Sequence, residues 1–420
     1  MGKDSISGNS QLPSLDLLNR QEPTVAAENV EVKKKRIAEV FHAYKIEVQE
    51  INVTIGPSVS LYEVKPYLGT NYKKIRLCED DIAISLGNPN LRFIIPIPGK
   101  MTIGIEIPNE NAINVPLGTV LSSKEFQETK MQLPCAIGKT IQNEVFMFDL
   151  TKTPHLLLSG SSGQGKTACL NTIICSLLYK KKSSELQFVL IDPKKVEFSI
   201  YNPLINHFLT KIPYEDASPI VTDITNIVST LNSLCNLMDS RYDQLKEVGA
   251  RNIKEYNEMF INKQSSVGRY DYMPYIVVII DEFGDLMMTV GKEVEQPIVR
   301  IAQLARAVGI HMIISTQRPS TAIITCSIKA NFPARIAFRV SDRFDSKTII
   351  DCGGAECLNG NGDMLVRLDS LDPVRIQGAY IEDKEIERIV SYIAKQGSYD
   401  SRKTSDITTC TTYNERLSEI

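Results

Sequence analysis

The sequence predicts an α/β fold, in which a large domain with a mostly parallel sheet follows a small α+β domain. Between residues 154 and 394, short apolar runs alternate with longer segments of helical periodicity, which is typical of a parallel sheet covered on both faces. Between residues 46 and 121, short β-rich runs are separated by Gly and Pro. The length of 420 residues is sufficient for two or three domains of roughly 100–200 residues each.

The composition argues against several classes of protein. Lys and Arg total 47 and Asp and Glu total 50, so the net charge is −3, and the hydrophobic fraction of 43% is ordinary for a globular protein. The longest apolar run, residues 275–280, is far shorter than the ~18 residues that a membrane-spanning helix needs. The nine cysteines have neither the spacing of a zinc site nor a pairing pattern. We therefore expect free thiols, a cytoplasmic location and no membrane segment.

The first part of the chain is interpreted in order. Residues 1–30 are polar and predict a mobile N-terminal arm. The basic run at 33–36 opens an amphipathic helix, and we favour a solvated helix start over a phosphate-binding arm. The small domain is placed at residues 31–130, with a helical connection near its end, at 122–133. Its strands are expected at residues 51–53, 60–64, 93–96 and 102–107.

The large domain is placed at residues 131–394, and a polar tail at 395–420. After a strand at 146–149, buried strands are expected at residues 155–159, 188–192, 275–281, 311–316, 336–340 and 364–367. Apolar stripes of helical spacing lie within residues 170–178, 220–238 and 298–308. We interpret these stripes as helix faces that pack against the core.

One motif indicates phosphate binding. The pattern GxxxxGK[ST] is matched by Gly160, Ser161, Ser162, Gly163, Gln164, Gly165, Lys166 and Thr167. An apolar strand ends just before this loop, and an amphipathic helix begins within it. Glycines let backbone N–H groups turn toward phosphates, where the N-terminus of the helix adds partial positive charge. Lys166 is expected to reach the β- and γ-phosphates, and Thr167 to hold Mg²⁺.

Two further strands end in polar residues. The run at 275–280 is followed by Asp281 and Glu282. Asp281 is expected to order Mg²⁺ and Glu282 to polarise the attacking water, which favours hydrolysis over nucleotide binding alone. The run at 311–316 is followed by Gln317, which is placed either to sense the γ-phosphate or to cap a turn.

A basic segment follows Gln317. Residues 318–347 carry six basic and two acidic side chains, a net charge of +4 in an acidic chain. The basic residues are Arg318, Lys329, Arg335, Arg339, Arg343 and Lys347. Such side chains suit the phosphates of a nucleic acid, but they also suit solvent or a neighbouring subunit. Charge alone leaves both interpretations open.

From about residue 32 to residue 393, the chain resembles the FtsK/SpoIIIE family of double-stranded DNA translocases. The matching stretches are residues 154–157, 160–167, 190–194, 249–252, 256–257, 274–278, 281–288, 305–311, 315–320, 329–338, 353–356 and 362–365. Residues 56–57, 97–100 and 106–109 resemble the smaller α domain of that family. The match departs from the family at Lys347, where Arg is usual, and at Gly284, where Ala is common and little effect is expected.

The resemblance implies a RecA-like P-loop motor that assembles as a hexamer around double-stranded DNA. ATP would sit at subunit interfaces, where an arginine of the neighbour completes the site; Arg306 is the first candidate and Arg335 the second. DNA-binding loops would contain Arg318, Lys329, Arg343 and Lys347. Contacts to the DNA backbone carry no direct sequence information, so movement along DNA would be largely independent of sequence.

Three functions are compared. The leading hypothesis is a pump for duplex DNA, driven by Mg-ATP hydrolysis, in chromosome partitioning or mobile-element DNA handling. The family commonly adds an N-terminal membrane region and a C-terminal winged helix, and we expect neither in this chain. The alternatives are a conjugative coupling or secretion ATPase of the same superfamily and a non-motor clamp that binds ATP and DNA. The presence of Lys166, Thr167, Asp281 and Glu282 argues against the clamp.

Overall fold

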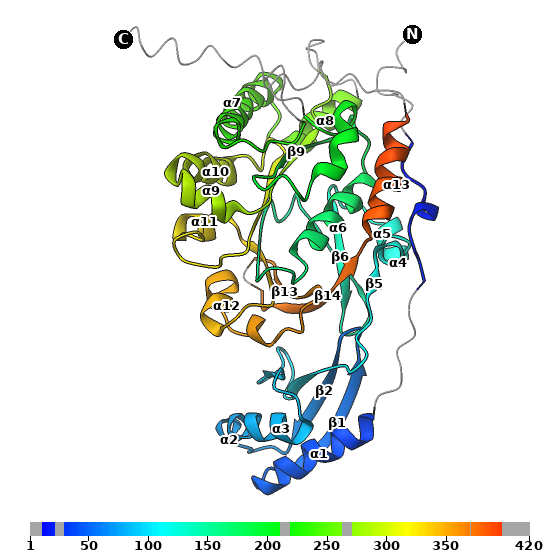
Figure 1. Cartoon of the computed structure of the whole chain (residues 1–420), viewed down its shortest axis with the longest axis vertical. Coiled ribbons are helices and arrows are strands. Elements are labelled where there is room, and N and C mark those ends of the chain that lie inside the picture. The colour runs from blue at the N-terminus through cyan, green and yellow to red at the C-terminus, as the bar shows by residue number, and fades with distance from the viewer. Residues whose placement is uncertain (1–10, 22–28, 211–218, 263–270, 370, 397–420) are drawn as a thin grey trace.

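The chain forms a small domain and a large domain, and the small domain lies below the large one in Figure 1. The structure is a computed structural model that describes residues 11–21, 29–210, 219–262, 271–369 and 371–396. The large domain surrounds a wide twisted sheet. Helices α7 and α9 to α12 lie on one side of the sheet, and α6 and α13 lie on the other (Figure 1).

The small domain, residues 29–109, is built on an antiparallel sheet in the order β1-β2-β4-β3. Its elements are α1 (Val30–Ala43), β1 (Val48–Ile55), β2 (Val59–Pro66), α2 (Tyr72–Leu77), α3 (Glu79–Leu86), β3 (Arg92–Ile94) and β4 (Ile103–Pro108). Ile37 and Phe41 are four residues apart and therefore share one face of α1. Both are buried in a core with Tyr62 and Ile105 from the sheet.

The large sheet has ten strands, in the order β7-β6-β14-β13-β12-β8-β11-β10-β9, with β5 paired to β14. The strands are β5 (Val115–Pro116), β6 (Pro134–Thr140), β7 (Val145–Asp149), β8 (His155–Ser159), β9 (Leu186–Ile191), β10 (Tyr275–Ile280), β11 (Ile310–Thr316), β12 (Ala334–Phe338), β13 (Asp363–Arg367) and β14 (Val374–Tyr380). From β9 to β12 the neighbouring strands are parallel, which confirms the α/β fold that the sequence predicts.

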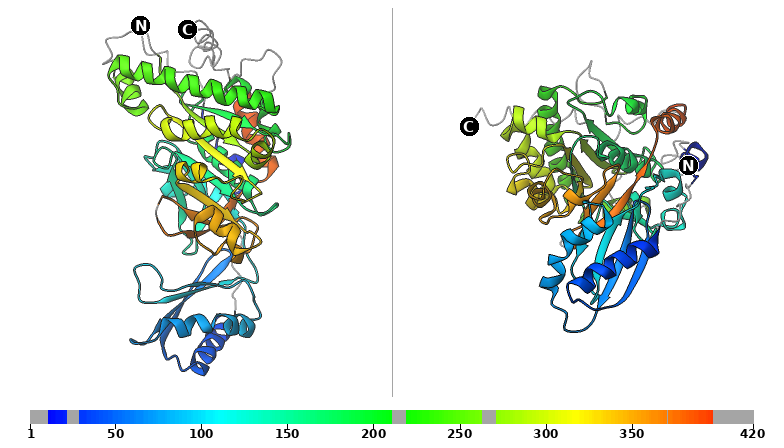
Figure 2. Two further views of the ribbon diagram at one scale, coloured as in Figure 1. Left: turned by 90° about the vertical axis from the view of Figure 1, so that its left-hand side faces the viewer. Right: turned by 60° about the horizontal axis from the view of Figure 1, so that its bottom comes forward.

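The helices of the large domain cover both faces of this sheet. They are η1 (Leu15–Leu17), α4 (Leu117–Leu121), α5 (Lys124–Gln127), α6 (Lys166–Leu178), η2 (Ser199–Asn206), α7 (Ile224–Val248), α8 (Ile253–Ile261), α9 (Phe283–Thr289), α10 (Lys292–Leu304), α11 (Cys326–Asn331), α12 (Arg343–Ile350), η3 (Ala355–Cys357) and α13 (Asp383–Ala394). The apolar stripe of α7 packs against α10, where the Cys235 thiol donates to the Pro297 carbonyl, and Figure 2 shows the two helices running together.

One half of the sheet differs from the expected mostly parallel arrangement. The pairs β12–β13, β13–β14, β14–β6 and β6–β7 are antiparallel. Strands β6 and β14 have no counterpart among the expected strands. Pro134 opens β6, and β14 buries Arg375 and Gln377, so neither segment has the continuous apolar run of a buried strand.

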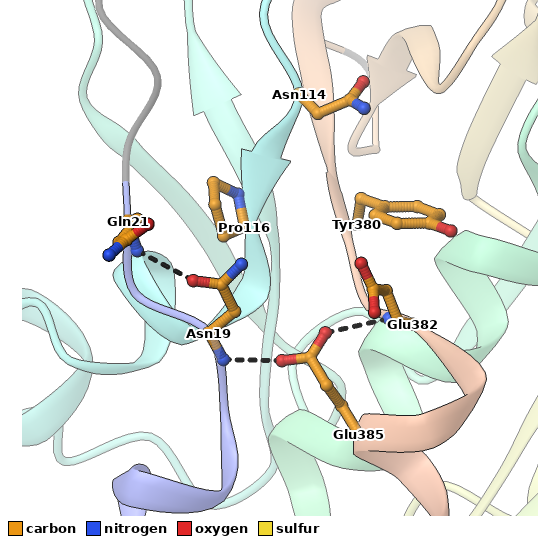
Figure 3. Close-up of a pocket in the computed structure, with 7 residues that line it drawn as sticks. All are labelled: Asn19, Gln21, Asn114, Pro116, Tyr380, Glu382 and Glu385. Atoms are coloured by element: carbon orange, nitrogen blue, oxygen red, sulfur yellow. Dashed lines mark hydrogen bonds between the residues drawn. The ribbon is translucent and has the colours of Figure 1, made fainter.

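The expectation of a mobile arm over residues 1–30 does not hold for residues 11–21. The buried Leu18 packs into the core of the large domain. The backbone N–H of Asn19 donates to the Glu385 carboxylate (2.6 Å), which also accepts from the N–H of Glu382 (Figure 3). These residues line a cavity of about 350 Å³ with Tyr380. The other parts of the expected arm, residues 1–10 and 22–28, and residues 397–420 of the expected tail lie outside the described residues.

The boundary between the domains lies near residue 110 rather than near residue 130. Leu117 and Phe126, on two short helices, are buried in the core of the large domain. Gly118 faces the carbonyl of Asn19 so closely that a Cβ would lie 2.2 Å from its oxygen. The expected helical connection at 122–133 is therefore short, and it belongs to the large domain.

A buried charge cluster joins the two domains. The guanidinium of Arg375 on β14 contacts Asp363 (2.6 Å) and Glu106 (2.7 Å), and Glu106 lies on β4 of the small domain. Arg92 is the second partner of Glu106, at 2.9 Å. Burial alone would raise the pKa of Glu106, but the charges of Arg92 and Arg375 outweigh it and lower that pKa. The two arginines therefore favour the charged form of Glu106.

We predict that Arg375→Met lowers the free energy of unfolding by about 3–5 kcal/mol, because it leaves buried carboxylates without their main partner. Urea unfolding followed by circular dichroism measures the change. Arg300→Met is the matched control, because Arg300 pairs with Asp239 in an exposed ion pair. The control is expected to lose about 0.2–1 kcal/mol. Equal losses in the two variants would contradict a structural role for the cluster.

Candidate nucleotide-hydrolysis site

The register of the parallel strands places the candidate site at one edge of the sheet. Ser159 pairs with Thr316, and Ile280 pairs with Ile191. The carboxyl ends of β8, β9, β10 and β11 therefore lie at the same edge. The loops that follow these strands carry the polar residues that the sequence analysis selected, and open parallel sheets bind ligands at this edge.

The phosphate-binding loop is held by backbone contacts on two sides. The N–H of Ser161 donates to the Arg339 carbonyl (2.9 Å), and the N–H of Gly362 donates to the Gln164 carbonyl (3.0 Å). Gly165 has φ +114°, and a Cβ at this position would lie 2.7 Å from the Cα of Gly362. Glycine is therefore required at position 165, both for the backbone conformation and for the close approach.

Lys166 is buried inside this loop. Its ammonium donates to the carbonyls of Gly160 and Ser161, both at 2.7 Å. Burial lowers the pKa of Lys166 to about 8, although the charges of Glu282 and Asp281 act in the opposite direction. A phosphate group would offer this ammonium a full negative charge in place of two carbonyl dipoles.

Oxygen-bearing side chains gather beside the loop. Asp281 accepts a hydrogen bond from the Ser315 hydroxyl (2.8 Å). Burial raises the pKa of Asp281, and the charges of Asp192 and Glu282 raise it further. Burial and the same kind of carboxylate repulsion raise the pKa of Glu197, which is hydrogen-bonded to Thr167. The Thr167 hydroxyl and the Asp281 carboxylate are oxygen ligands of the kind that Mg²⁺ prefers. Among the described residues, no group of three or more His, Cys, Asp or Glu side chains could hold a metal ion without further ligands.

Glu282 lies in the centre of the site. Its side chain is only 2% exposed, and its backbone has φ +49°. The carboxylate accepts from the Thr316 hydroxyl (3.1 Å) and from the backbone N–H of Gln317 (3.2 Å). The contact that Gln317 makes with Glu282 therefore comes from its main chain. The Lys194 ammonium lies 3.4 Å from the same carboxylate.

The sequence analysis missed Asp192, Lys194 and Glu197. Asp192 accepts hydrogen bonds from four backbone N–H groups of residues 194–198 and thereby fixes the loop after β9. This loop brings Lys194 to Glu282 and Glu197 to Thr167. The available signal was the position of Asp192, which follows a buried strand in the same way that Asp281 does.

The two candidate arginine fingers lie away from the phosphate loop. Arg306 is exposed in the turn that enters the amino end of β11, whereas the loop follows the carboxyl end of the neighbouring β8. The seven residues of β11 separate these edges by roughly 20 Å. Arg335 donates to the carbonyls of Phe332 and Lys329 and pairs with Asp351. Arg306 is therefore more accessible than Arg335 to the site of a neighbouring subunit.

The expected DNA-binding residues fall into two groups. Arg318 is exposed, and its guanidinium contacts the Met288 sulfur. Arg343 and Lys347 are exposed on α12, the lowest helix of the row on the left in Figure 1. Lys329 lies next to Lys347 but pairs with Asp351 (2.6 Å) and is only 23% exposed. Its charge is thus partly neutralised within the chain.

The fold and its phosphate-binding loop define a P-loop protein, and comparison with known proteins specifies the family. The model of the FtsK/SpoIIIE family matches residues 116–321, and that of the FtsK alpha domain matches residues 12–109. The chain belongs to the FtsK/SpoIIIE family, which is a family of P-loop ATPases. The match at 12–109 also agrees with the domain boundary near residue 110.

Two curated relatives illustrate the similarity. The chain is 44% identical over 392 residues to DNA translocase FtsK of Chlorobaculum tepidum, and 41% identical over 391 residues to DNA translocase SpoIIIE of Bacillus subtilis. Each alignment covers 92% of this chain and 48% of the relative. The chain thus spans about half the length of these proteins.

Two solved structures share the fold. The pCW3 conjugation coupling protein TcpA, solved as a monomer with ATPγS, has a TM-score of 0.55 at 22% identity, covering 86% of this chain and 99% of TcpA. The type VII secretion ATPase EccC of Thermomonospora curvata has a TM-score of 0.56 at 20% identity, covering 66% of this chain and 32% of EccC. Across the described ranges, we find no helix with the length and hydropathy needed to cross a membrane.

The pKa of Lys166 predicts the pH dependence of nucleotide binding. The protonated ammonium binds phosphate, and bound phosphate raises its pKa, so affinity for ATP should fall as the pH rises above about 8. Between about pH 7 and about pH 9, we expect roughly tenfold weaker binding. Titration with ATP in EDTA measures this effect without metal. Lys166→Arg is the control, because its guanidinium stays charged across this range. The same loss of affinity in the control would contradict the assignment to Lys166.

Proposed function

We propose that this chain is the motor portion of an ATP-dependent double-stranded DNA translocase. The main support is one observation: the loop after β11 both contacts the candidate catalytic Glu282 and begins the basic segment at Arg318. An element that reaches both the hydrolysis site and the expected DNA contacts suits a motor. The curated relatives named DNA translocase support the same proposal.

The proposed chemistry is hydrolysis of ATP. Glu282 accepts a proton from the attacking water, whose oxygen bonds to the γ-phosphorus while ADP leaves. Lys166 offsets charge on the β- and γ-phosphates, and the N–H groups of residues 160–167 surround them. Thr167 and Asp281 would hold Mg²⁺, which supplies further positive charge at these phosphates when bound.

The proposed assembly is a hexamer, in which Arg306 of one subunit completes the site of the next. Arg306 lies too far from the phosphate loop of its own chain to reach it, as the opposite edges of the sheet require. An exposed arginine at that position suits a head-to-tail interface, which closes into a ring when the rotation between subunits allows it.

The proposed substrate is duplex DNA, bound through its phosphates. Arg318, Arg343 and Lys347 are exposed and carry no ion pair among the contacts of the described residues, so they are the preferred contacts. Lys329 would contribute less because of Asp351. ATP and DNA occur together inside the cell, so the proposed activity is cytoplasmic, in chromosome partitioning or in mobile-element DNA handling.

We predict that duplex DNA stimulates ATP hydrolysis and that the stimulation weakens with salt. Comparing the rates at about 50 and about 200 mM salt tests backbone binding, because phosphate contacts release counterions. Glu282→Gln should keep ATP binding and lose at least about a hundredfold in rate. A folded protein that binds ATP but ignores duplex DNA at low salt would favour the coupling or secretion alternative.

We also predict that two inactive variants recover activity when mixed. Arg306→Ala should reduce hydrolysis by about a thousandfold. Lys166→Ala should remove nucleotide binding but still supply an intact Arg306. In a random equal mixture, about a quarter of the interfaces combine a functional site with a functional arginine. Arg300→Ala, an exposed arginine nearby on α10, should keep the wild-type rate. No recovery in the mixture would contradict a role for Arg306 in the neighbouring site.

A further inference from the structure

Three protein donors surround the carboxylate of Glu282. Oε1 accepts from the Thr316 hydroxyl (3.1 Å), and the Gln317 N–H contacts both Oε1 and Oε2 at 3.2 Å. The ammonium of Lys194 lies 3.4 Å from Oε2. The three donors make four contacts, because the single Gln317 N–H is shared between the two oxygens. Oε1 thus has two protein donors within hydrogen-bond distance, with which a water molecule must compete for its lone pairs.

The hydroxyl of Thr316 links Glu282 to the basic segment. It donates to Glu282 and also accepts from the backbone N–H of Arg318 at 3.1 Å. Thr316 is the last residue of β11, and Arg318 is exposed immediately after it. A displacement of the Arg318 backbone would therefore act directly on the hydroxyl that occupies Glu282.

Gly284 provides the space for this contact. A Cβ at position 284 would lie 2.6 Å from the Thr316 hydroxyl oxygen and 3.0 Å from Oε1 of Glu282. No side-chain carbon can remain that close to both atoms, so an alanine would force the hydroxyl or the carboxylate to move. The sequence alone leads us to expect little effect from Gly284 in place of alanine, whereas in this structure an alanine would not fit the contact without a shift.

We propose that Thr316 is a positioning residue that restrains Glu282 until duplex DNA moves the segment that begins at Gln317. The proposal rests on the proposed function, because it names DNA as the trigger. Loss of the Thr316 hydrogen bond frees one lone pair of Oε1, which then can accept the proton of the attacking water. Lys194 holds the other oxygen from the loop after β9 and adds to the restraint.

Removal of the hydroxyl tests the proposal. Thr316→Val has nearly the same shape and lacks the donor. We expect the rate of ATP hydrolysis without DNA to rise roughly threefold to tenfold, which corresponds to the loss of one hydrogen bond of ordinary net strength. The rate with saturating duplex DNA should change by less than about twofold, so the stimulation ratio falls. Thr316→Ser keeps the hydroxyl and should keep the wild-type ratio.

Gly284→Ala tests the same contact by a different route, because it keeps the hydroxyl and removes its space. This variant should also raise the DNA-free rate. The double variant with Thr316→Val should add little to either single change, because both act on one hydrogen bond.

Lys194→Met should raise the DNA-free rate as well. Lys195→Met, with the same charge change on the same loop, should not. Melting temperature and ATP affinity confirm that each variant is folded.

Failure of the proposed function and failure of the proposed restraint give different results. A wild-type rate that duplex DNA leaves unchanged contradicts the proposed function. A stimulated wild type, combined with a DNA-free rate that fails to rise in both Thr316→Val and Gly284→Ala, contradicts the restraint and leaves the proposed function intact. A lower rate in both variants, with and without DNA, would mean that Thr316 holds Glu282 in its active position instead.

Discussion

The parallel pairing of β9, β10, β11 and β8 is the constraint on which the candidate site depends. Each of these strands supplies a few residues to one edge, and none of the loops carries a complete site. Lys166 follows β8, Asp281 and Glu282 follow β10, and Thr316 ends β11. A shift of one residue in any pairing would exchange the two faces of that strand and separate these groups.

The sequence was informative wherever a strong local pattern coincided with a strand end. Lys166, Thr167, Asp281 and Glu282 could be selected because their runs are apolar and their motif is specific. The antiparallel half of the sheet could not be predicted in the same way. Arg375 is charged, and its burial depends on Asp363 and on Glu106, which lies 269 positions earlier in the chain. Pattern analysis along the chain does not detect such a distant partner.

The same reasoning explains what the sequence did not show within the site. Lys194 reaches Glu282 only because β9 and β10 are neighbours, although 88 positions separate the two residues. From the sequence alone, Lys329 could not be distinguished from an unpaired cation, but in the folded chain it pairs with Asp351. The contact between Thr316 and Glu282 depends on the left-handed backbone at Glu282 and on the missing side chain at position 284. Geometry of this kind follows from the folded structure and is absent from residue spacing.

The packing of residues 11–21 against α13 has a topological consequence. The chain passes from the large domain to the small domain and returns, so the small domain is an insertion with a connection at each end. Arg375 and Glu106 form a buried contact between this insertion and the large domain. The inserted domain is thus held by that contact as well as by the chain itself.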